Sequence, residues 1–292
     1  MKKNILLFIA IAYGLIVAAG LAFYLSDFSY ASPAGTVLGL ACMSFPLIAT
    51  LVCQKVEKKP LLRGLGISWK VNRWWFAGWF LILAIALFIL LFSYWIGGPQ
   101  NYSLNSVGLQ NASRQLGVPP MAVAVISILS GMLTGATINA LVGFGEEIGW
   151  RGYLLHQMQG QSFIRSAVII GTVWGLWHAP LILLGHNYPQ APGWGILCMV
   201  AICIPMGFIF QYFRLKSGSV LVPAIMHGTF NALAGLPSLF IQNPETYNYF
   251  LLGGTGLAGF LSLLLTCLLL YLFDRYVTHD NLITHPIASQ SH

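Results

Sequence analysis

Eight long apolar runs follow one another along the sequence, with few charges between them. Each run is about as long as the ~20 residues that a helix needs to cross the bilayer core. Only 7% of the 292 residues are charged, whereas soluble domains carry roughly 25%. We therefore predict an all-α, polytopic membrane protein with about eight transmembrane helices. The runs span approximately residues 4–25, 35–54, 74–97, 120–143 (continuing to about 157), 164–184, 194–213, 220–240 and 250–273.

The lysines and arginines predict the orientation of these helices. If the N-terminus is cytoplasmic, all but one of the 14 basic residues fall in cytoplasmic segments, and the exception is Arg114. This is the asymmetry that the positive-inside rule describes. Both termini are therefore expected in the cytoplasm, and we expect a multi-pass protein of a bacterial plasma membrane. Anionic lipid accounts for the net charge of +7, so no nucleic-acid partner is expected.

Two alternatives concern the ends of the chain and its cysteines. Residues 1–34 could be a cleaved signal peptide, since the small residues of "SYASPA" follow an apolar run. That run is longer than the usual 7–15-residue core of a signal peptide, so we expect a retained helix. The five cysteines are scattered through predicted spans without CxxC spacing. They are expected to be packing residues rather than disulfides or zinc ligands.

The chain shows no repeat and no soluble domain, so residues 1–292 are predicted to form a single integral membrane domain. Polar side chains are rare in the spans of residues 1–119, which are expected to be scaffold helices facing lipid. The side chains that could carry chemistry gather in residues 120–240, the predicted catalytic core. Residues 250–273 form the last helix.

Several side chains of this core are costly to bury in lipid and are therefore candidates for function. At 1.5 Å per residue, the three spans that carry them place Glu146, His178 and His227 ~16, ~21 and ~12 Å from their cytoplasmic helix ends. They can therefore meet at one level, near mid-bilayer and towards the cytoplasm. The full set is Glu146, Glu147, Arg151, His178, His227 and Asn231.

Helical spacing separates the two adjacent glutamates. Glu147 and Arg151 lie four residues apart on one helix face, which favours an ion pair. Glu146 is rotated by ~100° from Glu147 and points elsewhere. His227 and Asn231 are also four apart, so both can present hydrogen-bonding groups on one face.

These side-chain types suit the hydrolysis of an amide by water. A carboxylate and an imidazole can hold and deprotonate a water molecule. A second imidazole and a carboxamide can donate hydrogen bonds to a tetrahedral oxyanion. Neither a serine nor a cysteine lies at helical spacing from the histidines, which disfavours an acyl-enzyme. Alternatively, Glu146, His178 and His227 are ligand types of a catalytic zinc ion. The HExxH signature is missing, and the sequence leaves open whether the cofactor is one zinc ion or none.

Three motifs carry a resemblance to a known family. They are Glu146-Glu147-x-x-x-Arg151, Trp174-x-x-x-His178 and His227-x-x-x-Asn231. In this order they resemble EExxxR, FxxxH and HxxxN of the CAAX-protease and bacteriocin-processing (Abi) family of intramembrane peptidases. Trp174 stands where phenylalanine is usual, and we expect it to form an aromatic wall of the substrate cleft.

The resemblance implies roles for these residues. Glu146 and His178 would activate water, Glu147 and Arg151 would form an organising pair, and His227 with Asn231 would stabilise the oxyanion. It also implies an intramembrane protease that cleaves a peptide or a membrane-associated protein near the cytoplasmic face. Eukaryotic relatives cleave a prenylated C-terminal tripeptide, and bacterial ones act in bacteriocin processing or self-immunity. The alternative is a non-enzymatic membrane protein, either an immunity factor or a transporter with a buried Glu/His site. His186, near a predicted span end, is expected to have no catalytic role.

Overall fold

The computed structural model describes residues 3–287, in which the regular secondary structure is helical, with no strand and two isolated β-bridges. The predicted all-α fold class is confirmed. The helices are α1 (Lys3–Tyr24), α2 (Pro33–Cys42), α3 (Phe45–Val56), α4 (Arg73–Gly97), α5 (Val107–Leu116), α6 (Pro120–Ala136), α7 (Ile138–Glu147), α8 (Leu155–Gln157), α9 (Phe163–Trp177), α10 (Ala179–Leu183), α11 (Pro192–Ser217), α12 (Leu221–Leu233) and α13 (Leu257–Tyr276). A π-helical segment, η2 (Ile148–Leu154), joins α7 to α8, and a 3-10 turn, η3 (Leu236–Phe240), follows α12.

Six helical segments within residues 3–287 are long and apolar enough to cross a membrane, or seven if α5 and α6, bent by 88°, are counted as one span. The six are α1, α2 with α3, α4, α9 with α10, α11 and α13. The other two predicted spans, 120–143 and 220–240, consist of shorter helices. The first is broken at Thr137, where φ is −117° and ψ is −89°, and α12 ends at Leu233. The chain is thus an integral, multi-pass membrane protein.

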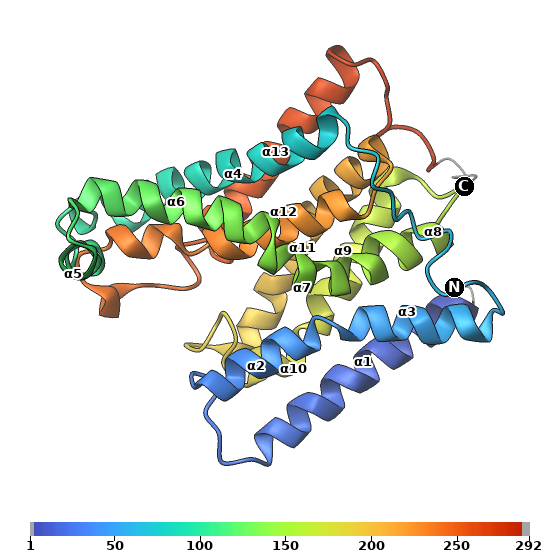
Figure 1. The fold of residues 1–292 in the computed structure, drawn as a ribbon, viewed down its shortest axis with the longest axis horizontal. Coiled ribbons are helices and arrows are strands. Elements are labelled where there is room, and N and C mark those ends of the chain that lie inside the picture. Colours follow the sequence, from blue (N-terminus) through green and yellow to red (C-terminus); the bar gives the residue numbers. More distant parts are fainter. Residues whose placement is uncertain (1–2, 288–292) are drawn as a thin grey trace.

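The helices form a bundle with α9, α11 and α12 at its centre (Figure 1). Helices α1, α2 and α3 lie on one side of this centre, and α4, α6 and α13 lie on the other (Figure 1). Helix α11 packs along α9, and α12 packs against α6 and α7. The helices that carry the candidate residues are therefore neighbours in the middle of the molecule.

Two glycines allow these central helices to approach each other closely. A Cβ atom at Gly228 would lie 2.4 Å from the carbonyl oxygen of Gly135, so α12 packs backbone to backbone against the break between α6 and α7. A Cβ atom at Gly175 would lie 2.5 Å from the Cα of Val200 on α11. Each glycine neighbours a candidate residue in the sequence, and close packing therefore fixes the positions of His227 and Trp174.

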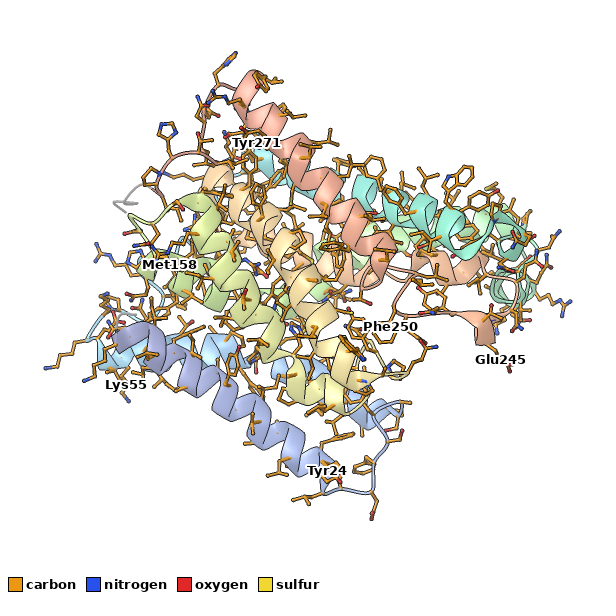
Figure 2. All side chains as sticks on the ribbon, turned by 180° about the vertical axis from the view of Figure 1, so that it is seen from behind. Tyr24, Lys55, Met158, Glu245, Phe250 and Tyr271 are labelled. Atoms are coloured by element: carbon orange, nitrogen blue, oxygen red, sulfur yellow. The ribbon has the colours of Figure 1, made fainter. Side chains whose placement is uncertain are left out.

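The loops separate into two groups at opposite ends of the bundle. Figure 2 shows Lys55 and Met158 at one end and Tyr24, Glu245 and Phe250 at the other. Helix α1 begins at this first end of the bundle (Figure 1), and the described segment after α13 reaches the same end, where Ile287 pairs with Gly160 and Gln161. This arrangement fits a chain with both ends on one side of a membrane. That this side is the cytoplasm stays a prediction.

A polar network centred on Glu57 fastens the end of α3 to η2 and α8. The Glu57 carboxylate accepts hydrogen bonds from the Tyr153 hydroxyl at 2.5 Å and from Gln157 Nε2 at 3.2 Å, and it pairs with Lys59 at 2.5 Å. Burial raises the pKa of Glu57, but these partners outweigh burial and lower the pKa below its usual value of 4.5. The charged carboxylate therefore stabilises the folded state.

Acidification is expected to remove this contribution. Because the folded pKa is lowered, the stabilisation is present above pH 4.5 and is lost as the pH falls through the folded value. Glu57→Gln should lower the free energy of unfolding at pH 7 by on the order of 1 kcal/mol and flatten its pH dependence below 4.5. Thermal unfolding in detergent at neutral and acidic pH measures both, with the exposed Glu245→Gln as the control. Equal acid sensitivity of Glu57→Gln and the unsubstituted protein would contradict the assignment.

Candidate active site

A cavity of about 670 Å³ lies among the central helices. Its walls come from α2, α7, α9 to α12 and the segment between α12 and α13. The lining residues include Glu146, Trp174, His178, His227 and Asn231. The structure thus brings the four proposed catalytic residues and the proposed cleft residue to one cavity.

Glu146 lies in the last turn of α7, and its side chain is buried at the cavity wall. Its Oε2 atom accepts a hydrogen bond from Trp174 Nε1 at 2.6 Å and a longer one from Trp150 Nε1 at 3.4 Å. Both indoles bind the same carboxylate oxygen. They hold the carboxylate in one orientation and leave Oε1 for a ligand in the cavity.

Glu147 is the centre of a buried charge cluster. Its Oε1 atom lies 2.9 Å from Arg151 Nη1 and 2.9 Å from His227 Nδ1. The Arg151 guanidinium also lies over the Trp174 ring, 4.4 Å from its centre, an arrangement that favours a cation. The expected pairing of Glu147 with Arg151 is present, and the contact with His227 adds a second partner. Glu147 therefore connects the arginine of η2 to the imidazole of α12.

The two cavity histidines are held through their Nδ1 atoms by different acceptors. His178 Nδ1 lies 2.8 Å from the carbonyl oxygen of Trp174. A carbonyl oxygen only accepts, so Nδ1 carries the proton and the Nε2 of a neutral His178 has a free lone pair. His227 Nδ1 faces the Glu147 carboxylate, which stabilises an imidazolium and so allows Nε2–H to donate. The centre of the Trp174 ring lies 5.9 Å from that of His178 and 5.5 Å from that of His227.

Asn231 lies one turn beyond His227 on α12. Its side chain is exposed and borders the cavity. The predicted shared face of His227 and Asn231 therefore turns towards the cavity.

Local geometry departs from the sequence expectation after the two glutamates. A continuous α-helix was expected to about residue 157, but η2 is π-helical from Ile148 to Leu154. Such wide turns occur frequently at functional sites.

Trp174 was expected only as an aromatic wall of the cleft, and it also donates to Glu146. A phenylalanine has no N–H and could not make this bond.

His186 and Tyr30 also line the cavity, and neither was predicted to do so from the sequence. The His186 ring stacks on that of His178, with 6.3 Å between ring centres and 5° between planes. Its Nδ1 atom lies 3.0 Å from the Tyr30 hydroxyl, and burial lowers the pKa of His186 to about 4. From the sequence, His186 was expected to lie near the end of a span and away from the site. It lines the cavity instead because the helix breaks at His178, between α9 and α10. Tyr30 comes from the loop before α2, far away in the sequence.

The zinc alternative is not supported by the arrangement of the side chains. Among residues 3–287, no group of three His, Cys, Asp or Glu side chains is placed to hold one metal ion. The predicted ligand set of Glu146, His178 and His227 does not form such a group. We therefore derive no step through a metal.

Fold and cavity together define a polytopic helical membrane protein with a buried carboxylate–imidazole site. Residues 128–233 match the family model described as Type II CAAX prenyl endopeptidase Rce1-like. The chain is also similar to CAAX prenyl protease 2 of Methanococcus maripaludis, with 33% identity over 87 residues, which are 28% of this chain and 32% of that protein. The match thus spans about a third of that relative's length. The matched residues 128–233 contain all three motifs, and the similarity confirms the predicted resemblance to the CAAX-protease and bacteriocin-processing family.

Proposed function

We propose that the protein is an intramembrane endopeptidase that hydrolyses a peptide bond with water activated by Glu146 and His178. The observation that carries the proposal is the single cavity bordered by one carboxylate and two imidazoles with different Nδ1 partners. One imidazole offers a lone pair at Nε2, and the other offers a proton. The similarity to CAAX prenyl endopeptidases supports the same activity.

The proposed reaction balances with these groups alone. Water binds between Glu146 Oε1 and His178 Nε2, and Glu146 takes its proton as the oxygen attacks the substrate carbonyl. His227 Nε2–H and the Asn231 amide donate hydrogen bonds to the resulting oxyanion. The proton on Glu146 then passes to the leaving nitrogen as the C–N bond breaks. The products are a new carboxylic acid, which keeps the second proton of the water, and a new amine; proton transfer between them then gives a carboxylate and an ammonium group.

The cavity wall on α11 indicates the kind of substrate. Met199, Ile202, Cys203 and Met206 line the cavity at helical spacing and form an apolar strip. Such a strip fits apolar side chains, or an alkyl group attached to the peptide. We propose a membrane-associated peptide or protein as the substrate, in a bacterial plasma membrane.

Hydrolysis in ¹⁸O-labelled water tests the proposal. Purified protein in detergent is incubated with a peptide library, and new fragments are identified by mass spectrometry. Each new C-terminus should contain one ¹⁸O atom, and added hydroxylamine should give no hydroxamate, because no acyl-enzyme forms. A hydroxamate product would contradict the water mechanism. Peptide binding without fragments would favour an immunity factor or a transporter instead.

The indole of Trp174 should contribute measurably to turnover. Trp174→Phe keeps an aromatic ring but removes the N–H that holds Glu146. A hydrogen bond to a charged group contributes about 1.5–3 kcal/mol, so kcat should fall about 10- to 100-fold with little change in KM. Steady-state peptide hydrolysis measures both constants.

Trp79→Phe is the matched control. Trp79 Nε1 donates to the carbonyl oxygen of Met132, away from the cavity, so kcat should be unchanged. Equal kcat values for Trp174→Phe and the unsubstituted protein would show that the bond to Glu146 does not support catalysis.

A further inference from the structure

The cavity reaches only one end of the bundle. Its lining includes Tyr30 from the loop between α1 and α2, His186 and Asn187 from the loop between α10 and α11, and several residues of 234–255 between α12 and α13. These three loops alternate in the chain with those that carry the basic residues. Figure 2 shows Glu245 and Phe250, which belong to the third loop, opposite Lys55 and Met158.

The opposite end carries nearly all the positive charge. Four segments lie at this end: the connections from α3 to α4, from α8 to α9 and from α11 to α12, and the segment that follows α13. None of the residues that line the cavity in the described chain is a lysine or an arginine. Among residues 3–287, Arg114 at the end of α5 is the one lysine or arginine of the cavity end. The exposed basic residues of the opposite end include Lys55, Lys58, Lys59, Lys70, Arg165 and Arg275.

The charge difference between the two ends of the bundle indicates which side of the membrane the cavity faces. Segments rich in lysine and arginine stay in the cytoplasm, so the cavity end faces the other way. We infer that the cavity takes its peptide from the extracytoplasmic face of the membrane. This inference rests on the proposed endopeptidase function and names the side from which its substrate comes. The sequence led us to expect cleavage near the cytoplasmic face. That expectation was based only on the distances of three residues from their helix ends, and it did not consider the loops that line the mouth of the cavity.

The mouth also limits the chemistry of the peptide. Its exposed lining residues are neutral, namely Thr36, Leu40, Asn231, Gly235, Ser238, Pro244 and Tyr249. Glu146 is the one acidic residue among the lining residues of the described chain, and it lies buried at the reaction centre. Apart from His227, which is already paired with Glu147 at the reaction centre, the described lining offers no lysine or arginine to pair with an acidic side chain or a terminal carboxylate. The site therefore suits an uncharged internal stretch of an extracytoplasmic peptide.

Cysteine labelling in intact cells tests the direction of the cavity. Glu245→Cys places a thiol on the exposed loop at the cavity end, and Lys55→Cys places one at the basic end. A membrane-impermeant maleimide should label Glu245→Cys in intact cells and Lys55→Cys only after the membrane is opened. The unsubstituted protein gives the background from its five native cysteines. The reverse labelling pattern would overturn the inference.

Hydrolysis by oriented vesicles tests the inference separately from the proposed function. The probe is a quenched fluorescent peptide that the detergent-solubilised protein cleaves, with a charged tag outside the cleaved stretch that prevents it from crossing the membrane. Right-side-out vesicles should cleave it at least about tenfold faster than inverted vesicles, and detergent should remove the difference. Faster cleavage by inverted vesicles would overturn the inference and leave the endopeptidase in place. Absence of hydrolysis in detergent would reject the proposed function, and labelling would still decide which face the cavity meets.

Discussion

Glu146→Gln is expected to lower kcat for peptide hydrolysis by about 10²- to 10⁴-fold, the range that general-base catalysis contributes. Glutamine has nearly the same shape as glutamate, and its amide oxygen can still accept a hydrogen bond from Trp174. It cannot take a proton from water. The variant should therefore fold and bind peptide while the chemical step fails, so the loss should appear in kcat rather than in KM.

Single-turnover and steady-state hydrolysis of one peptide measure this loss. Glu57→Gln is the matched control, since Glu57 also accepts hydrogen bonds from side chains but lies away from the cavity. It should retain kcat at neutral pH. A Glu146→Gln variant that keeps more than about a tenth of the unsubstituted kcat would exclude Glu146 as the base.

Glu147→Ala is expected to lower the free energy of unfolding by about 3–5 kcal/mol, the usual cost of removing one partner of a buried ion pair. Glu147 and Arg151 are both almost fully buried, with side-chain exposures of 0% and 1%. The substitution leaves the guanidinium without its carboxylate and removes the acceptor of His227 Nδ1. Thermal or denaturant unfolding in detergent measures the loss.

A double substitution separates stability from catalysis at the same place. Glu147→Leu with Arg151→Met replaces the ion pair by apolar side chains, and such replacements are often neutral or stabilising. Stability should therefore recover largely, whereas hydrolysis should stay impaired because His227 has lost its carboxylate. Full recovery of hydrolysis in the double variant would show that Glu147 does not act through His227.

The features that the sequence predicted are those that depend on local spacing. Apolar runs of membrane length predict spans, and a separation of four residues places Glu147 beside Arg151 whether the turn is α- or π-helical. The three motifs likewise place Glu146, His178 and His227 in spans that can meet. Each of these inferences needs only the periodicity of one helix and the thickness of a bilayer.

The features that the sequence did not predict depend on contacts between distant segments. The bond from Trp174 to Glu146 joins residues 28 positions apart, and the bond from His227 to Glu147 joins residues 80 positions apart. The break at Thr137 depends on packing against Gly228. Helix α2 was expected to be lipid-facing scaffold, and it lines the cavity through Gly35, Gly39 and their neighbours. No periodicity within one segment reports such pairings.

The position of Trp174 couples groups that would otherwise vary independently. Its N–H donates to Glu146, its ring lies under the Arg151 guanidinium, its main-chain carbonyl oxygen accepts from His178, and its ring packs against that of His227. Exchange of Trp174 for a smaller aromatic residue would remove the N–H donor to Glu146 and change the ring that packs against Arg151 and the two imidazoles, whereas the main-chain carbonyl that binds His178 would remain. Trp150, whose Nε1 donates to the same carboxylate oxygen at 3.4 Å, would then be the remaining indole donor. Substitutions at positions 150 and 174 are therefore expected to be epistatic.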